Sequence, residues 1–283
     1  QGQRLHFSGD LGRQQESLMN PPTPLPACDV LVCGSTYGNR EHVPIDQEAE
    51  LAPIIRRVAA RGGVIVIPAF AVGRAQALML HIARLRERKE IPRVPVYLNS
   101  PMAINATRHY HAHHSEHHVS EEDCQRMFDV ATFVNTVEES KALNRQRGPM
   151  IIISASGMAT GGRVLHHIEA FGPDDRNAIL LSGYQAGGTR GAALAAGKRT
   201  LRMFGREVPI RAEVVQLEGF SGHADAGELL DWMRTAPSAP RVVSLPHGEP
   251  DAADTLRGRV QRELGWRARV PEHLERVGLE DAR

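Results

Sequence analysis

The sequence predicts an α/β protein with a mainly parallel sheet that helices cover on both faces. Short, continuous apolar runs, at residues 64–67, 150–154 and 178–181, alternate with amphipathic helical stretches. Loops rich in Gly, Ser, Thr and Arg follow these runs, and parallel sheets bind ligands beyond the carboxyl ends of their strands. The length of 283 residues fits one large domain or two of ordinary size.

The pattern of predicted elements changes twice along the chain. Residues 4–7 and 29–33 predict strands on either side of a Pro-rich linker. From about residue 45 a strand–turn–helix pattern repeats, with a helix at 46–61, a strand at 64–67, a helix at 74–88, a strand at 94–98, a helix capped by Ser100-Pro101, a strand at 150–154, a helix from Arg163, a strand at 178–181 and a helical stretch after 191. Strands return at 213–217 and 241–245, each ending in a loop that carries a histidine.

Composition excludes several classes of protein. With 41% hydrophobic residues, 24% charged residues and no apolar run long enough to cross a bilayer, the chain predicts a folded protein without a membrane partner. A net charge of +1 excludes a globally basic nucleic-acid coat protein, and 5% aromatic residues argue against broad base-stacking surfaces. Cys28, Cys33 and Cys124 are too few and too irregular for a disulfide framework. Because no signal peptide is evident either, we expect a cytoplasmic location.

Three loops carry the residues best suited to chemistry. Asp10 lies in Phe-Ser-Gly-Asp-Leu-Gly-Arg, His223 in Phe-Ser-Gly-His-Ala-Asp and His247 in Pro-His-Gly-Glu, each after a predicted strand and beside glycine. A carboxylate and two neutral imidazoles are suitable zinc ligands, and glycine leaves room for a metal or a substrate. Taken singly, each of these residues is also an ordinary turn residue.

In chain order, the segments FSGDLGR, STYGNREH, PAFAVGRAQALM, SPMAINAT, ISASGMATGGRVLHH, GYQAGGTRG, FSGHAD and HGEP resemble the β-CASP branch of the metallo-β-lactamase superfamily. Its members are RNA-processing ribonucleases similar to the cleavage factor of messenger-RNA 3′-end formation. The resemblance runs from Phe7 to about Trp266. It implies a partial metallo-β-lactamase αββα sandwich (residues 1–40 and 203–283) with an inserted β-CASP α/β domain (residues 41–202), the last segment being concerned with RNA specificity.

The resemblance also implies roles for the three loop residues. Asp10 matches the carboxylate that bridges two zinc ions, and His247 matches the last zinc ligand. His223 matches the histidine that protonates the leaving oxygen. Two zinc ions suit hydrolysis of RNA phosphodiester bonds, because they lower the pKa of the attacking water and stabilise charge on the phosphorane oxygens.

The sequence departs from this family in three places. The signature His-x-His-x-Asp-His and one further histidine are expected upstream of Asp10 and do not occur there, so we expect this chain to be inactive alone. Gly34 stands where an acidic residue orients the histidine that matches His223, and Asp225 or a residue of the missing segment is a candidate to replace it. Asn99 stands where Asp often precedes Ser-Pro-Met-Ala.

A histidine-rich run at residues 109–118 imitates the missing signature. On a continuous helix His109, His113 and His117 share one face, which could bind a metal. The run follows a predicted helix start, whereas the signature belongs to a loop after a strand. We therefore favour a solvated polar face over a metal site.

The loop at residues 154–163 combines hydroxyls, backbone N–H groups at a helix N-terminus and a guanidinium, which suit phosphate binding. The candidate RNA-phosphate ligands are Ser156, Gly157, Thr160, Gly161, Gly162 and Arg163, together with Arg74 and Arg190 in the equivalent loops. The alternative is a tight turn whose glycines serve packing only.

The sequence therefore predicts, as a complete protein, a zinc-dependent ribonuclease that acts on RNA. The alternative is a non-catalytic, RNA-binding relative of the same family. A third interpretation, a DNA-directed hydrolase, is disfavoured because DNA-directed relatives tend to carry valine at the motif of His247. The resemblance also implies homodimerisation through the C-terminal region.

Overall fold

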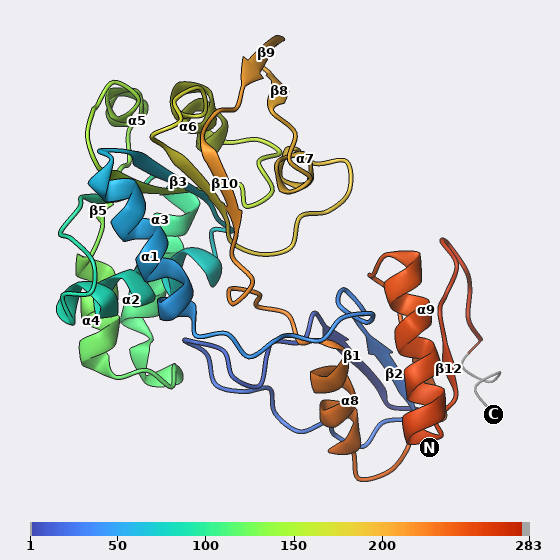
Figure 1. Ribbon diagram of the computed structural model, residues 1–283. Coiled ribbons are helices and arrows are strands. Elements are labelled where there is room, and N and C mark those ends of the chain that lie inside the picture. The colour runs from blue at the N-terminus through green and yellow to red at the C-terminus, as the bar shows by residue number, and fades with distance from the viewer. Residues whose placement is uncertain (1, 279–283) are drawn as a thin grey trace. The chain divides into compact units, whose positions relative to one another are not determined.

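The computed structural model describes residues 2–278 and divides the chain into two compact units (Figure 1). Unit 1 comprises Gln1–Glu16, Asn20–Val43 and Gly222–Arg283, and unit 2 comprises Ser17–Met19 and Pro44–Ser221. Unit 2 is therefore inserted in the sequence of unit 1. Across residues 2–278, each helix is too short or too polar to cross a membrane.

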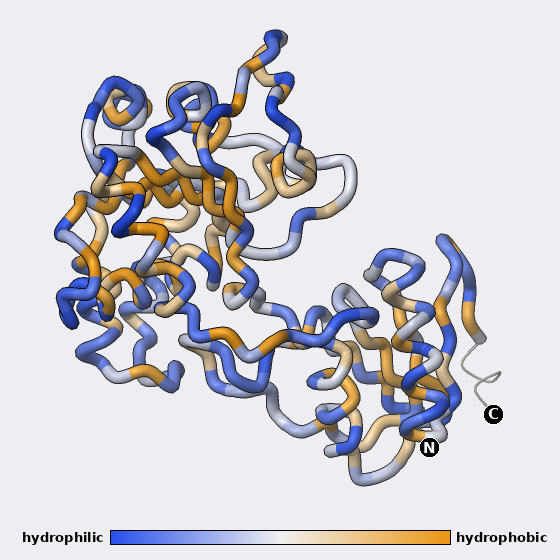
Figure 2. Tube along the Cα trace, viewed as in Figure 1, coloured by the Kyte–Doolittle hydropathy of each residue, from blue (hydrophilic) through white to orange (hydrophobic). Residues whose placement is uncertain are grey.

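Unit 2 is built on a six-stranded parallel sheet with the strand order β10-β7-β3-β6-β4-β5. The strands are β3 (Val64–Pro68), β4 (Val96–Leu98), β5 (Thr132–Phe133), β6 (Met150–Ser154), β7 (Ala178–Leu181) and β10 (Glu213–Gln216). Every residue of β3, β6 and β7 is buried, as continuous apolar runs predict for strands covered on both faces. Figure 2 shows these strands as the most hydrophobic part of the unit.

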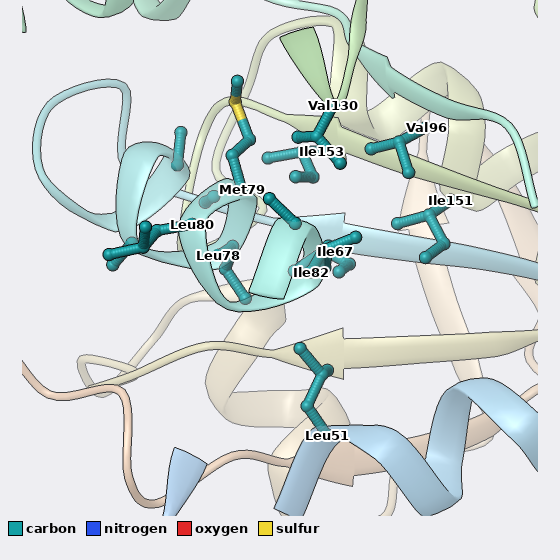
Figure 3. Packing of buried hydrophobic residues seen from close by; sticks show 14 of the residues in the cluster. Leu51, Ile67, Leu78, Met79, Leu80, Ile82, Val96, Val130, Ile151 and Ile153 are labelled. Atoms are coloured by element: carbon teal, nitrogen blue, oxygen red, sulfur yellow. The ribbon is translucent and has the colours of Figure 1, made fainter. Parts of the chain in front are cut away.

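Helices cover both faces of this sheet and divide its core in two. Ile65 and Ile67 of β3 belong to one cluster, with α1 to α4, and Figure 3 shows part of it. Val64 and Val66 of the same strand belong to the other cluster, with α5 to α7. The helices are α1 (Gln47–Ala60), α2 (Arg74–Glu87), α3 (Pro101–Ala112), α4 (Glu121–Asp129), α5 (Val137–Leu143), α6 (Arg163–Phe171) and α7 (Arg190–Ala195).

Side chains at the first turn fix where most of these helices begin. Asp46 accepts the backbone N–H groups of the first turn of α1, Ser100 caps α3, and Thr136 forms a capping box on α5. The antiparallel hairpin of β8 (Thr200–Met203) and β9 (Arg206–Pro209) completes the unit, with Leu201, Met203 and Val208 in the second core cluster.

Unit 1 contains a four-stranded parallel sheet, β1 (Leu5–Gly9), β2 (Val30–Cys33), β11 (Val242–Ser244) and β12 (Ala268–Arg269), in the order β1-β2-β11-β12. Helices α8 (Ala226–Arg234) and α9 (Pro250–Arg259), the latter continued by a π-helical turn at Val260–Leu264, contribute to one core cluster with this sheet. That cluster contains Leu31, Cys33 and Val243 from the strands.

The alternate residues of the unit 1 strands form a second, more exposed apolar face. Val30, Val32 and Val242 form a small separate cluster. On β1, Leu5 pairs in register with Val30 and is 42% exposed, and Phe7 pairs with Val32 and is 67% exposed. Large apolar side chains in register on one sheet face are typical of a surface that a further layer covers.

The structure confirms the predicted parallel α/β fold. In unit 2, β10 pairs with β7 and extends the sheet, so this compact unit runs to Ser221, and the domain division predicted at residue 202 stays a prediction. The histidine run does not form one helical face, because α3 ends at Ala112 and residues 114–116 form a 3₁₀ turn.

Candidate active site

The candidate zinc ligands of unit 1 lie at the carboxyl edge of its parallel sheet. Asp10 follows β1, Gly34 to Thr36 follow β2, and His247 comes three residues after β11. The three strands are parallel neighbours, so the loops that follow them meet at one edge. The fold thus brings together residues that are 237 positions apart in the chain.

Asp10 and His247 contact each other directly. His247 Nδ1 lies 2.9 Å from Asp10 Oδ1, with 69% of the His247 side chain and 33% of the Asp10 side chain exposed. The Thr36 hydroxyl lies 3.3 Å from both Asp10 Oδ1 and the His247 carbonyl, so it can donate to either oxygen. The side chains of the two predicted ligands therefore lie side by side, and Thr36 contacts the Asp10 carboxylate and the His247 backbone.

Close backbone packing positions this pair. A Cβ atom at Gly34 would lie 2.8 Å from the Gly9 carbonyl oxygen and 2.9 Å from Asp10 Oδ1. A Cβ atom at Gly248 would lie 2.5 Å from Ser35 Oγ, whose hydroxyl donates to the Pro246 carbonyl. Glycine at position 34 is therefore a packing requirement of this fold, and the acidic residue expected from the resemblance would not fit without a shift of Asp10.

Cys33, the last residue of β2, offers no thiolate beside this pair. It is fully buried, and burial, reinforced by the neighbouring Asp10 carboxylate, raises the pKa of its thiol to about 11. At neutral pH the side chain is therefore a neutral thiol in the core below the site.

His223 belongs to the same unit and lies in the loop before α8. Gly12 and His223 form an isolated antiparallel β-bridge, and the Ala224 N–H donates to the Leu11 carbonyl. These backbone contacts fix the loop of His223 beside the loop that carries Asp10. The His223 ring contacts the buried Tyr37 ring edge-on, with centroids 6.0 Å apart. Tyr37 comes from the Ser-Thr-Tyr-Gly segment, so that motif positions both His223 and, through Thr36, the ligand pair.

Asp225 caps the helix that follows it, α8. Its Oδ1 accepts the Glu228 backbone N–H and its Oδ2 accepts the His42 backbone N–H at 2.6 Å. Glu228 in turn accepts the Asp225 N–H, which completes a capping box at the start of α8. Both carboxylate oxygens of Asp225 thus accept a backbone N–H, and the suggestion that this carboxylate also orients the His223 ring stays a prediction.

The same capping box explains a group of potential metal ligands. Within residues 2–278, one set of three His, Cys, Asp or Glu side chains has ligand atoms within 4.8 Å of one another, namely His42, Asp225 and Glu228. The carboxylates serve the helix cap, and His42 Nε2 lies 2.9 Å from the His223 carbonyl, to which it donates. These atoms already have the hydrogen bonds that a buried cap requires.

Asp10 and His247 have the right donor atoms for zinc but are too few. Catalytic zinc takes three protein ligands as a rule, and a two-zinc site takes more. The residues between 2 and 278 therefore do not complete a zinc site by themselves. Within residues 2–278 the histidine run does not add one, since it contains no group of three ligand atoms within 4.8 Å of one another. His118 Nδ1, for example, lies 2.8 Å from the Met19 carbonyl.

In unit 2, the predicted phosphate loops also meet at one edge of a sheet. Arg74 follows β3, the loop of residues 155–162 follows β6, and Arg190 follows β7, which are adjacent parallel strands. The Gln185 side-chain amide donates to the Gly157 carbonyl, and the Gly191 N–H donates to the Met158 carbonyl. The loops after β6 and β7 therefore form one bonded structure.

Ser156 closes the loop after β6 on itself. Its Oγ accepts the backbone N–H groups of Thr160 and Gly161, at 3.1 and 3.3 Å. The Gly162 N-cap has a φ of +79°, and a Cβ atom there would lie 2.6 Å from the Ala155 carbonyl oxygen. These contacts account for Ser156 and Gly162 by loop packing, and phosphate binding by the loop stays a prediction.

Arg163 and Arg190 use their guanidinium groups within the protein. Arg163 donates to Asn99 Oδ1 at 2.9 Å and to the carbonyls of Val134 and Asn135. Arg190 donates to the Arg202 carbonyl at 2.9 Å and also bonds backbone oxygens of the loop after β6. The half-buried Arg74 guanidinium packs against Gly183.

Asn99 is the centre of a buried polar network, which explains the third sequence departure. Its Oδ1 accepts from Arg163, and its Nδ2 lies 2.8 Å from Ser140 Oγ and 2.6 Å from His167 Nε2. An aspartate at this position would have no N–H to donate to Ser140 or His167.

Comparison with known proteins agrees with this architecture. The Beta-Casp domain family matches residues 75–194, and the Zn-dependent metallo-hydrolase RNA specificity domain family matches residues 207–271. The chain belongs to the β-CASP family of the metallo-β-lactamase superfamily. Unit 2 contains the matched part of the inserted β-CASP domain, and the RNA specificity match runs from β9 into unit 1.

Curated relatives of this β-CASP protein include a bacterial and two archaeal proteins. Ribonuclease TTHA0252 of Thermus thermophilus is 39% identical over 259 residues, which are 89% of this chain and 58% of the relative. The transcription termination factor FttA of Methanosarcina mazei is 31% identical over 98% of this chain and 46% of its own length. The RNase J-like protein of Methanocaldococcus jannaschii is 30% identical, covering 88% of this chain and 59% of the relative. The chain spans about half the length of these relatives.

The structure adds residues that the sequence did not single out. Thr36 and Tyr37 position the ligand pair and His223, and His42 holds the loop of His223 through its backbone carbonyl. The sequence feature that could have pointed to them is the segment STYGNREH, in which small and polar residues directly follow an apolar strand. Which partner each side chain contacts depends on loops from the far end of the chain.

Proposed function

We propose that this chain is part of a zinc-dependent ribonuclease that hydrolyses RNA phosphodiester bonds. Asp10 and His247 are its metal ligands, and His223 donates the proton to the leaving oxygen. The direct contact of Asp10 Oδ1 with His247 Nδ1 carries the proposal, because it places a carboxylate and an imidazole from loops 237 residues apart side by side at the carboxyl edge of the sheet. The RNA specificity match and the ribonuclease relative support RNA as the substrate.

The remaining zinc ligands must come from protein outside the described residues. Two observations support a larger protein: the ligand pair is incomplete, and the relatives are about twice as long as this chain. The exposed apolar sheet face that carries Phe7 supports it as well. Within the site, Thr36 holds Asp10, and Tyr37 limits the rotation of the His223 ring.

The test uses the full-length protein encoded by the gene. We expect about two zinc ions per chain, measured by plasma mass spectrometry after dialysis, and cleavage of a labelled single-stranded RNA. Asp10→Asn and His247→Ala should lose zinc and activity together. His223→Ala should keep zinc and lose activity by about 10²- to 10⁴-fold, the usual contribution of a general acid.

Asp251→Asn is the matched control, because Asp251 is an exposed carboxylate of the same unit that bonds Asn39. It should keep both zinc and activity. Cleavage at the wild-type rate by Asp10→Asn and His247→Ala would overturn the assignment of the ligands. RNA binding without zinc or cleavage in the full-length protein would instead establish the alternative, a non-catalytic RNA-binding relative.

A further inference from the structure

The hairpin β8–β9 of unit 2 presents an aromatic side chain where the backbone favours a small polar one. Its two-residue turn consists of Phe204, with a φ of +50°, and Gly205, with a φ of +79°. Positive φ at both central residues is typical of a type I′ turn, in which Asn-Gly is the preferred sequence. Phenylalanine is strained in this conformation, so its side chain must serve another purpose here.

The Phe204 ring is both exposed and held in place. It is 52% exposed and stacks on the exposed His166 ring of α6, with centroids 4.4 Å apart and ring planes 13° apart. Glu169, three residues further along α6, accepts two hydrogen bonds from Arg206 at the other side of the turn. Leu201 and Val208 anchor the base of the hairpin in the core. Figure 1 shows the hairpin projecting from the body of unit 2.

The surroundings of the ring are rich in positive charge. The segment from residue 198 to 211 has Lys198, Arg199, Arg202, Arg206 and Arg211 against Glu207 as its single acidic residue. Of the five cations, Arg206 is paired with Glu169. The other four are exposed and form no ion pair with any residue between 2 and 278.

We propose that Phe204 and His166 form a stacking platform for a base of single-stranded RNA, with Arg202 and its neighbouring cations binding the backbone phosphates. A planar ring with one face free and several unpaired cations nearby is the combination that binds single-stranded nucleic acid. The RNA specificity match begins at residue 207, on β9 of this hairpin. This inference rests on the proposed function, since it takes RNA as the ligand.

Charge decides between RNA and a protein partner for this surface. An exposed apolar ring alone would suit either, but four exposed cations without ion pairs in the segment that carries it favour a polyanion. The glutamates present, Glu169 and Glu207, are too few to neutralise the segment. The platform is also fixed before binding, because the hairpin and α6 hold the two rings together.

The test is the affinity of the whole chain for a short fluorescein-labelled oligouridylate, measured by fluorescence anisotropy with EDTA present. Phe204→Asn should weaken binding by about 5- to 100-fold, the range for one stacked base. It should not weaken folding, because Asn suits the turn. Phe204→Trp, which keeps an aromatic ring, should bind as the wild type does. Arg202→Ala should reduce the slope of log affinity against log salt concentration by roughly 0.7.

Leu274→Asn is the matched control, because Leu274 is also an exposed apolar residue with a positive φ of 62°. It should bind the oligonucleotide as the wild type does. If the wild type binds but Phe204→Asn binds equally well, the platform is wrong while the proposed function stands. Unchanged RNA affinity with reduced self-association in Phe204→Asn would assign the surface to a protein contact instead. If the wild type fails to bind RNA at low salt, the platform is wrong, and cleavage of RNA by the full-length protein then decides the proposed function separately.

Discussion

At the scale of single residues, Gly34 shows how a departure from a family pattern can be a requirement of the fold. A side chain here would meet the Gly9 carbonyl and the Asp10 carboxylate. We expect Gly34→Ala to destabilise unit 1 by about 1–3 kcal/mol, the usual cost of overpacking. Both tryptophans, Trp232 and Trp266, lie in unit 1, so urea unfolding followed by tryptophan fluorescence measures this unit.

The control for this substitution is Gly12→Ala in the same unit. The nearest atom to a Cβ atom there is the Gly222 carbonyl oxygen, at 4.0 Å, which is an ordinary contact. Its free energy of unfolding should stay within about 0.5 kcal/mol of the wild type. Equal stability of the two variants would mean that Gly34 is not a tight contact and that the position can accept a side chain.

At the scale of elements, a buried polar network joins β4, α5 and α6. His167 on α6 accepts from Asn99 Nδ2, after β4, and donates from Nδ1 to Asn144 Oδ1, after α5, both at 2.6 Å. Burial, with smaller contributions from the charges of His166 and Arg163, lowers the pKa of His167 to about 4. His167 is therefore neutral in the folded protein at physiological pH.

This network predicts a pH dependence of stability. Between about pH 6.5 and 4 the unfolded chain binds a proton that folded His167 does not, so stability is complete above pH 6.5 and falls as the pH falls. The loss attributable to His167 should approach about 3 kcal/mol at pH 4. Urea unfolding by circular dichroism should show a shallower pH dependence for His167→Gln, whereas His109→Gln, an exposed residue of α3, should keep the wild-type dependence. A wild-type slope in His167→Gln would contradict the assignment.

The elements that the sequence predicts best are those whose own residues specify them. The apolar runs of β3 and β6 and the Ser100-Pro101 start of α3 lie within a few residues of their predicted positions. Pairing is different: nothing in the residues of β10 shows that it joins β7 rather than the sheet of unit 1. The turn of the β8–β9 hairpin could not be predicted either, because its sequence is Phe-Gly and not the Asn-Gly that is typical of such turns.

In the candidate site, too, the sequence predicted which residues matter but not which partners they contact. Resemblance pointed to Asp10, His223 and His247, and the fold places the first and last of them in contact. It could not show that Asp225 serves a helix cap or that Arg163 bonds Asn99 and two carbonyls. Those bonds depend on the loops that surround each side chain, and a motif specifies residue types without specifying their partners.

At the scale of the whole molecule, the two faces of the unit 1 sheet are unequal. Helices α8 and α9 pack with Leu31, Cys33 and Val243 on one face. On the other face Phe7 is 67% exposed and Leu5 is 42% exposed. If the proposed ribonuclease is the longer protein that its relatives indicate, this face is where its further layer packs, which also brings the missing ligands to the edge that holds Asp10.

Phe7→Ser tests this arrangement by comparing the same substitution in two chains. In the 283-residue chain the side chain is already exposed, so the free energy of unfolding should change by no more than about 0.5 kcal/mol. In the full-length protein the same substitution should cost about 3 kcal/mol or more, the cost of removing a buried phenylalanine. Leu274→Ser, at a side chain that is 85% exposed, should change neither protein. A small effect of Phe7→Ser in both proteins would show that this face stays open to solvent, and the remaining zinc ligands would then have to reach Asp10 and His247 from another direction.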